Sequence, residues 1–315
     1  MGTSFNMSNA LRIVFAGTPA NAATTLAELH ATGANIVGVL TREDAKVGRS
    51  KDLSPSPVGE LAEQLGLSVR KTNSIDSESR EWLIGLQADL GVVVAYGTIF
   101  RADVLAIPRL GWINLHYSLL PELPGPAPVQ HALLRGLSDT GVTAFRLDEG
   151  IDTGPIISQS VIEIDESDNA ATLLGKLTKE GSNLLKDILH RGETCVLSAV
   201  AQTLSTSSVS AFKPTRMFAR LDFNSPAQSL ANKVRAMNPE PMAWFEVNGI
   251  NMRVLSARAI DEQTPVSQAQ LLRRELVVGC QLGSLILETV QPAGKNPMPG
   301  ADWFRGLRIE KLAIS

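Results

Sequence analysis

Apolar runs and helical patterns alternate along the first 110 residues of the chain. Short stretches in which nearly every residue is apolar are typical of strands that are buried on both faces. Three such stretches cover 11–16, 35–40 and 89–95, and helical patterns over 20–30 and 58–65 follow the first two. Strands of this kind, alternating with helices, predict an α/β fold with a doubly wound, Rossmann-like parallel sheet.

The pattern changes in the last third of the chain. After a helical pattern over 172–190, the segment 201–212 is rich in Ser and Thr and has little periodicity. Several short strand-like runs at close spacing then predict a small β-barrel. These runs cover 243–247, 252–255, 275–280 and 284–290. We therefore expect one domain over 8–200, a linker over 201–212 and a second domain over 213–315.

Composition narrows the class of protein. The 315 residues are 44% hydrophobic and 19% charged, which excludes wholesale disorder. No run of ~18 apolar residues occurs, and residues 1–9 lack the basic and apolar regions of a signal peptide. Cys195 and Cys280 are far apart in the sequence, and neither has a second metal ligand beside it. We therefore predict a reduced, cytoplasmic protein without a membrane span or a metal site, and we expect a monomer.

Charge is distributed unevenly along the chain. Residues 1–200 carry 16 Lys and Arg against 23 Asp and Glu, whereas residues 201–315 carry 13 against 9. A basic C-terminal part on an acidic N-terminal part suggests an anionic partner such as a nucleic acid. Ordinary variation of surface charge explains the same counts equally well, so both interpretations stay open.

The connection over 41–57 is unusually long, because a strand-to-helix loop normally takes ~2–6 residues. It follows a strand at the edge where parallel sheets bind ligands. A mobile clamp on an anion and an ordinary solvated loop both fit this pattern. Its basic residues are Arg42, Lys46, Arg49 and Lys51.

The segment 111–121 carries the candidate chemistry. Asn114 and His116 are two positions apart, so in a strand both side chains point to the same face. A carboxamide beside an imidazole is a donor pair that suits a carbonyl oxygen on which negative charge develops. Asp152, framed by Gly150 and Gly154, is a candidate to orient the imidazole or to move a proton. A structural histidine and a simple turn are the competing interpretations.

Several cofactor motifs are missing from the sequence. It contains no HExxH metal motif, no GxGxxG dinucleotide fingerprint and no GxxxxGK[ST] phosphate loop. The usual sequence support for metal, nicotinamide or P-loop chemistry is therefore lacking.

Five segments in order nevertheless resemble the folate-dependent formyltransferases. They are 15–19 (FAGTP), 55–58 (PSPV), 92–97 (VVVAYG), 114–121 (NLHYSLLP) and 148–154 (DEGIDTG). Further matches in the second domain cover 236–239, 242–244 and 291–295, so the resemblance extends over nearly the whole chain.

The resemblance implies a reaction and a set of residues. It implies that 10-formyltetrahydrofolate donates a formyl group to the α-amino group of methionyl initiator tRNA, without a metal. It makes Asn114, His116 and Asp152 the catalytic residues, and it implies an OB-like second domain that binds the acceptor arm. The residues that it places at the folate site are Tyr96, Gly97, Ser118, Leu119, Leu120 and Pro121.

The chain departs from the family pattern at three places. Tyr117 stands where the family usually has a small residue, and Pro124 precedes Gly125 where an Arg-Gly pair is common. Ala45 stands in the long loop where the family usually has the arginine that enters the acceptor end. We expect Arg42 or Lys46 to make that contact instead.

Three other functions remain open from the sequence alone. The same chemistry on another amine, such as a nucleotide-linked amino sugar, needs a similar site. A hydrolase that passes the formyl group from folate to water needs a similar pocket. A non-catalytic RNA-binding protein is the third, although binding alone does not need the pattern of Asn114, His116 and Asp152.

Overall fold

The computed structural model describes residues 11–46, 52–203 and 210–314. The chain forms two compact units, each made of three segments. The first unit consists of Met1–Gly125, Thr140–Ile162 and Leu174–Ser210, and the second of Pro126–Asp139, Glu163–Leu173 and Ala211–Ser315. The expected boundaries at 200 and 213 stay predictions.

The first sheet has seven strands in the order β5-β2-β1-β6-β7-β8-β9. Five neighbouring strands, from β5 to β7, pair in parallel, and β8 runs antiparallel to β7. The predicted doubly wound parallel sheet is thus confirmed, with an antiparallel strand added beside β7, as is common in α/β folds. The strands are β1 (Ile13–Gly17), β2 (Ile36–Thr41), β5 (Val69–Lys71), β6 (Leu90–Val94), β7 (Trp112–His116), β8 (Asp139–Arg146) and β9 (Ile156–Glu163).

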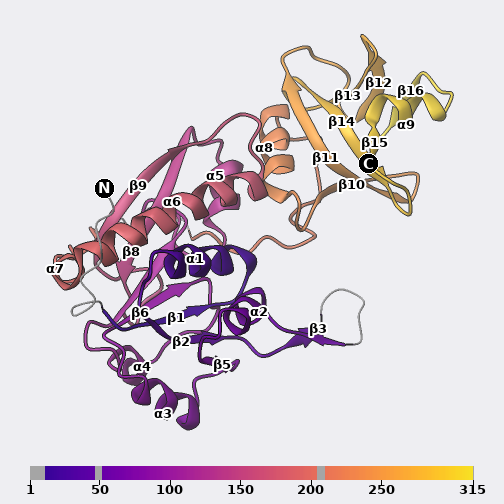
Figure 1. Cartoon of the computed structure of the whole chain (residues 1–315). Coiled ribbons are helices and arrows are strands. Elements are labelled where there is room, and N and C mark those ends of the chain that lie inside the picture. The colour runs from indigo at the N-terminus through magenta and orange to yellow at the C-terminus, as the bar shows by residue number, and fades with distance from the viewer. Residues whose placement is uncertain (1–10, 47–51, 204–209, 315) are drawn as a thin grey trace, which may run out of the picture. The chain divides into compact units, whose positions relative to one another are not determined.

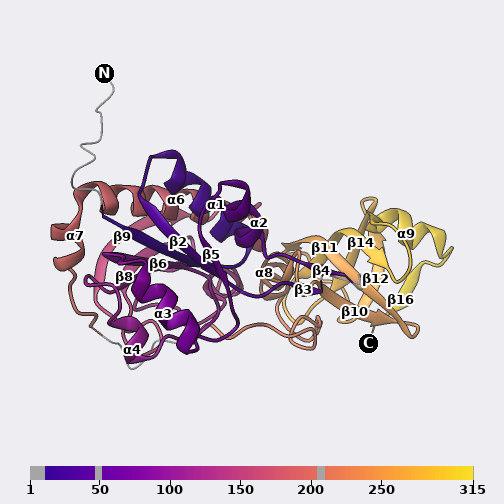
Figure 2. The same cartoon turned by 60° about the horizontal axis from the view of Figure 1, so that its bottom comes forward.

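Helices lie on both faces of this sheet. Helices α1 and α6 cover one face, and α3 and α4 cover the other (Figures 1 and 2). Ser56 caps α2 by accepting a hydrogen bond from Gly59 N at 3.0 Å, and Asp76 caps α3 in the same way. The helices are α1 (Ala20–Ala31), α2 (Pro57–Gln64), α3 (Ser77–Gly85), α4 (Ala102–Leu105), α6 (Ala170–Arg191) and α7 (Glu193–Leu197).

The core of the sheet is packed too tightly for a side chain at one strand position. Every residue of β1 and β6 is buried, as expected for strands covered on both faces. A Cβ atom added to Gly91 would stand 2.0 Å from the ring of Trp112. The Trp112 indole donates to Val104 O at 3.0 Å, which fixes the ring between the sheet and α4.

The long connection after β2 contains a short antiparallel hairpin. Strands β3 (Ala45–Lys46) and β4 (Leu53–Ser54) pair, and residues 47–51 lie outside the described part of the chain. Lys71 Nζ holds the base of this hairpin through Asp44 at 2.9 Å and Glu63 at 2.8 Å. The expected loop is therefore a hairpin at its base, and its predicted mobility stays a prediction.

The second unit is built on an antiparallel sheet in the order β10-β11-β14-β13-β12-β16, with β15 beside β14. Among the described residues, β10 and β16 do not pair with each other, so the sheet has an open, half-barrel form. The prediction of a small barrel-like unit is confirmed. Its strands are β10 (Ala243–Val247), β11 (Ile250–Ile260), β12 (Gln268–Leu272), β13 (Glu275–Gly279), β14 (Ser284–Pro292), β15 (Met298–Pro299) and β16 (Lys311–Ala313). Its helices are α5 (Pro128–Leu134), α8 (Ala227–Met237) and α9 (Gly300–Gly306).

A helix that crosses a membrane must be both long and apolar. None of the helices in the described ranges meets both requirements.

Candidate active site

Strand β7 carries Asn114 and His116 at the carboxyl edge of the first sheet. Asn114 is in register with Val93 of β6, and His116 is the last residue of β7. Because side chains alternate along a strand, Asn114 and His116 point to the same face. Ligands bind at this edge in doubly wound sheets, so the predicted pair lies where chemistry is expected.

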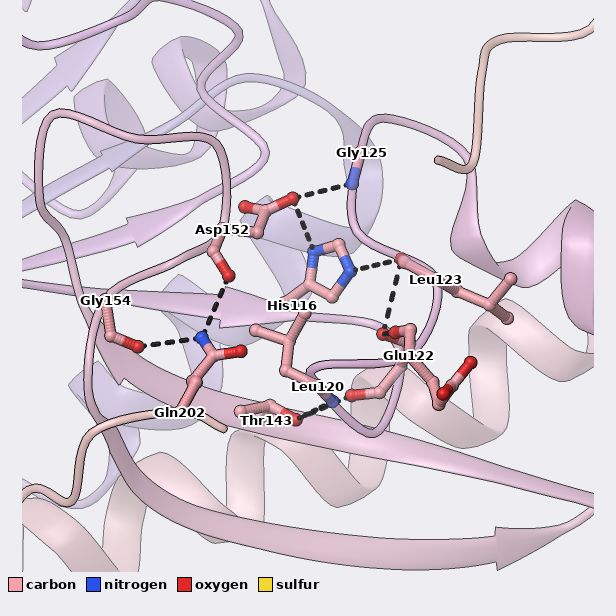
Figure 3. A network of polar contacts seen from close by, with 10 residues as sticks. His116, Leu120, Glu122, Leu123, Gly125, Thr143, Asp152, Gly154 and Gln202 are labelled. Carbon is pink, nitrogen blue, oxygen red and sulfur yellow. Dashed lines mark hydrogen bonds and ion pairs between the residues drawn. The ribbon is translucent and has the colours of Figure 1, made fainter. Parts of the chain in front are cut away.

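His116 is buried between two oxygen acceptors. Its side chain lies 3.0 Å from Leu123 O through Nε2 and 3.6 Å from Asp152 Oδ2 through Nδ1 (Figure 3). A backbone carbonyl only accepts, so Nε2 carries a hydrogen and donates to Leu123. Nδ1 therefore faces the carboxylate, with which the ring forms an ion pair when Nδ1 also carries a hydrogen.

Asp152 is held from both its backbone and its side chain. Its Oδ2 accepts a hydrogen bond from Gly125 N at 2.7 Å, and the side chain is 14% exposed. The backbone has φ of +55°, in the left-handed region that non-glycine residues rarely adopt. The structure therefore brings Asp152 to His116, as predicted, by a loop conformation that the rest of the fold must stabilise.

The loop between β8 and β9 is closed around Asp148. The carboxylate of Asp148 accepts from Gly150 N at 3.0 Å and from Thr153 Oγ1 at 2.9 Å. A Cβ atom on Gly154 would stand 1.8 Å from Arg146 O, so only glycine fits there. The two glycines expected to frame Asp152 thus allow the turn that points it inward.

Asn114 differs from His116 in that no described residue forms a hydrogen bond with its side-chain carboxamide. The residue is half-buried, and its side chain has no hydrogen-bond partner in the part of the chain that the structure describes. An amide group at the ligand edge of a sheet with unused donors is available to a substrate oxygen.

The segment after His116 is fastened to β8 and β9. Ser118 Oγ donates to Glu122 O at 2.6 Å, so its hydroxyl is used inside the loop. Thr143 Oγ1 donates to Ser118 O at 2.7 Å and accepts from Leu120 N at 3.1 Å. Gln159 Nε2 donates to Leu120 O at 2.8 Å. Four predicted folate residues thus lie in one fixed loop beside His116: Ser118, Leu119, Leu120 and Pro121.

Tyr96 and Gly97 follow β6 at the same edge. The Tyr96 phenol is buried and donates to Thr72 O at 2.9 Å, and burial raises the pKa of Tyr96 to about 12. Gly97 has φ of +82°, and its carbonyl accepts from Arg42 Nη2 at 3.1 Å. The structure therefore brings Arg42, predicted to contact tRNA, to Gly97, predicted to contact folate.

The other predicted tRNA contacts are placed only in part. Lys46 is exposed in β3, whereas Arg49 and Lys51 lie outside the described residues. Their contacts with tRNA stay predictions.

A pocket that the sequence analysis missed adjoins the loop of Asp152. It has a volume of about 590 Å³. Its apolar wall comes from α4 and the residue after it, whose ordinary sequence gives no signal of a ligand. Only the glycine-containing segment 148–150, which also lines it, belonged to a motif. The lining residues are Ala102, Leu105, Ala106, Gly111, Arg146, Leu147, Asp148, Glu149 and Gly150.

Two of the departures from the family pattern leave the His116–Asp152 pair intact. Tyr117 is buried, and its hydroxyl accepts from Asn21 Nδ2 of α1 at 2.9 Å. Tyr117 follows the last residue of β7, and this hydrogen bond holds its ring against α1. Gly125 keeps the backbone N–H that binds Asp152, although Pro124 precedes it.

The described ranges hold no candidate metal site. No group of three or more His, Cys, Asp or Glu side chains is placed to hold a metal ion there.

Comparisons with known proteins identify the family. The sequence model of the family described as "Formyl transferase" matches residues 11–189, and that of "Formyl transferase, C-terminal domain" matches residues 214–308. The chain belongs to the formyl transferase family.

Curated relatives are similar over nearly the whole chain. The chain is 40% identical over 299 residues to a methionyl-tRNA formyltransferase of Renibacterium salmoninarum, covering 94% of this chain and 97% of the relative. It is 39% identical over 302 residues to the protein of that name from Mycobacteroides abscessus, covering 95% and 98%.

A solved structure shares the fold at low sequence identity. It is the N-formyltransferase from Helicobacter canadensis in complex with folinic acid and dTDP-3-aminofucose. The TM-score is 0.65 at 18% identity, with 88% of this chain and 98% of that chain covered. This likeness supports the two-unit fold.

Proposed function

We propose that this chain transfers a formyl group from 10-formyltetrahydrofolate to the α-amino group of methionyl initiator tRNA. The observation that carries the proposal is the arrangement of His116 against Asp152, with the Asn114 carboxamide on the same strand. The relatives that share about 40% of the sequence over nearly its full length are named for this reaction.

For this reaction the protein must mainly align the amine with the formyl group and stabilise the negative charge that develops on the formyl oxygen. The attacking amine has a pKa of ~7.7–8.0 in simple peptides, so roughly 10–17% of it is neutral at pH 7 without an activating residue. Asn114 offers donors to the formyl oxygen, on which negative charge develops during attack. His116 provides a second donor when its Nε2–H turns from Leu123 O to the formyl oxygen. As the new bond to the amine forms, the bond between the formyl carbon and the folate nitrogen breaks. Asp152 orients the His116 ring, and the pair passes the proton that the amine loses to the departing folate nitrogen.

The pocket beside the loop of Asp152 suits the folate. Its volume of about 590 Å³ lies within the ~300–1,000 Å³ typical of small-molecule sites. Its lining combines apolar residues of α4 with the polar segment 148–150, a combination that suits a flat heteroaromatic ring with amide-like edges. We infer that the pterin ring binds here and that the formyl group then lies toward His116.

The second unit carries a surface suited to RNA phosphates. Two guanidinium groups lie over the ring of Trp244 of β10: that of Arg216 is 5.5 Å from the ring centroid and that of Arg220 is 5.7 Å from it. Arg253 is directly opposite Trp244 on β11, and all three arginines are exposed. We call Arg216, Arg220, Trp244 and Arg253 the Trp244 surface.

Arg220 of the Trp244 surface lies near Asp222, whose pKa is lowered mainly by hydrogen bonds from Asn224 and to a smaller extent by the charges of Lys233 and Arg220. Within the described residues, none of the three arginines of this surface forms an ion pair, whereas Arg258 pairs with Glu275 at 2.7 Å. Exposed guanidinium groups that form no ion pair and lie close to one ring are suited to phosphodiester oxygens, which they bind with release of counterions. This surface supports a nucleic acid, rather than an amino sugar, as the formyl acceptor.

The test is formyl transfer from labelled 10-formyltetrahydrofolate. Methionyl initiator tRNA, uncharged tRNA, a nucleotide amino sugar and buffer alone serve as four acceptors. We expect label on methionyl-tRNA alone. Label on the amino sugar, or release as formate in every tube, would establish one of the other two enzymatic functions.

A further inference from the structure

The side-chain carboxamide of Gln202, a residue outside the predicted catalytic set, binds the loop of Asp152 through two hydrogen bonds. Gln202 Nε2 donates to Asp152 O at 2.9 Å and to Gly154 O at 2.8 Å (Figure 3). An amide NH2 group has two hydrogens, so both bonds form at once. Gln202 is half-buried at the start of the segment 201–212 and belongs to the same compact unit as Asp152.

These two carbonyls depend on Gln202. Residues 147–155 lie between β8 and β9, so the Asp152 and Gly154 carbonyls are outside the strand ladders. Among the described residues, no other group donates to either carbonyl. Buried carbonyls of an irregular loop need such partners, and here a single side chain provides both.

Gln202 and Gly125 fix opposite ends of the same residue. Gly125 N binds the Asp152 carboxylate at 2.7 Å, and Gln202 binds the Asp152 carbonyl. Between these two anchors the backbone keeps its left-handed conformation, with φ of +55°. Release of the carbonyl would let the backbone leave this region and carry Oδ2 away from His116 Nδ1.

The orientation of the Gln202 amide shows which of its atoms matters. Its Oε1 is buried without a hydrogen-bond partner among the described residues. A flipped amide would place Oε1 against two carbonyl oxygens, which repel it, so the network dictates that nitrogen faces the loop. The two Nε2 hydrogens are thus the part of the Gln202 amide that binds the loop, whereas Oε1 accepts no hydrogen bond from a described residue.

We propose that Gln202 is a positioning residue for acyl transfer, which holds the Asp152 loop so that the carboxylate faces His116. The proposal rests on the proposed function for its kinetic test but not for its structural one. Gln202 touches no reacting atom, so its effect passes through Asp152. Misplacement of a catalytic group by about 1 Å is enough to lower turnover about 100-fold.

The kinetic test is a double-mutant cycle between Gln202 and Asp152. We expect Gln202→Leu to lower kcat about 100-fold, with KM for folate and for tRNA within twofold of the parent value. Gln202→Glu keeps the size but turns an acceptor toward both carbonyls, so its loss should be at least as large. In an Asp152→Asn background, Gln202→Leu should change kcat less than twofold, because the carboxylate that it positions is already gone.

Gln263 provides a matched control in the second unit. Its Nε2 also donates to two backbone carbonyls, Thr264 O at 3.0 Å and Cys280 O at 2.9 Å. Gln263→Leu should leave kcat unchanged. A full 100-fold further loss from Gln202→Leu in the Asp152→Asn background, or native kcat in Gln202→Leu alone, overturns the proposal.

A spectroscopic readout tests the proposal without any acceptor. In the ¹⁵N-labelled full chain, the ring nitrogens of His116 report the distance and charge of Asp152, and His116→Gln assigns their signals. We expect Gln202→Leu to shift these signals in the direction that Asp152→Asn does, and Gln263→Leu to leave them in place. Unchanged His116 signals in folded Gln202→Leu overturn the proposal, whereas absent transfer by the parent chain would overturn the proposed function alone.

Discussion

The His116–Asp152 pair of the first unit and the Trp244 surface of the second are both polar, but they are built in opposite ways. His116 is 6% exposed, and each of its ring nitrogens faces a fixed oxygen. The arginines of the Trp244 surface are exposed and form no ion pairs in the described chain. One region is buried and held by fixed neighbours, whereas the other is exposed and forms no ion pairs among the described residues.

This difference separates two tasks of an enzyme with a large substrate. Acyl transfer needs groups aligned within a fraction of an ångström in a site with little water, which requires burial and fixed partners. Capture of a polyanion needs accessible charge, whose effect depends on salt. Changes in the first region should therefore alter kcat, and changes in the second should alter KM and its salt dependence.

The largest effect is expected at His116. His116→Ala removes the ring that contacts Asp152 and Leu123, and loss of one such donor typically lowers turnover ~10²–10³-fold. Steady-state assays of formyl transfer should show this loss in kcat, with KM for tRNA nearly unchanged. Near-native turnover in a variant with a native circular dichroism spectrum would remove His116 from the mechanism.

A second variant tests whether close packing fixes the conformation of the Asp152 loop. Gly154→Ala places a Cβ atom against Arg146 O, so the loop must shift. We expect kcat to fall at least 10-fold and the free energy of unfolding to fall by roughly 1–3 kcal/mol, as for other overpacked sites. Turnover and urea unfolding measure the two effects.

Gly175 of α6 is the matched control for Gly154. A Cβ atom there meets nothing within 4 Å. Gly175→Ala should therefore stabilise the chain by roughly 0.5–1 kcal/mol, because alanine favours the helix, and kcat should not change. Equal effects of the two alanines would mean that the loop tolerates displacement.

The Trp244 surface should respond in KM. Arg216→Gln combined with Arg220→Gln removes two phosphate contacts, so KM for tRNA should rise about 10-fold and the slope of log KM against log salt should fall by roughly 1.5. Arg258→Gln combined with Arg305→Gln removes the same charge from arginines that pair with Glu275 and Asp302. If both double variants raise KM for tRNA equally, tRNA binding depends only on net charge, and the Trp244 surface is not a specific binding site.

The smallest effect is expected at the hairpin base. Arg42→Ala combined with Lys46→Ala should raise KM for tRNA a few-fold, about the loss of one or two exposed phosphate contacts, with KM for folate within twofold. Arg42 also binds Gly97 O, at the predicted folate edge. A weaker folate KM with unchanged tRNA kinetics would assign the hairpin base to the folate site instead.

The sequence predicted strands well where local pattern was sufficient, and it placed Asn114 and His116 on one strand. Strand β10 covers the expected 243–247, and β6 lies within 89–95, because continuous apolar runs can be satisfied only by burial. The two-residue spacing of Asn114 and His116 required no tertiary information once β7 was expected. The strand β11, in contrast, extends to Ile250–Ile260, where only 252–255 was expected, because exposed polar positions alternate along it.

By itself, then, the sequence determined which segments are buried, which residue types could perform acyl transfer and how they are spaced along β7. Only the tertiary structure decided what holds them. It brought Asp152 to His116 across 36 positions, placed Gln202 on the loop carbonyls and formed the pocket from ordinary residues of α4. It also set three arginines around Trp244. These contacts join residues far apart in the chain, and their geometry depends on the packed sheet and its loops, which no local pattern of residues encodes.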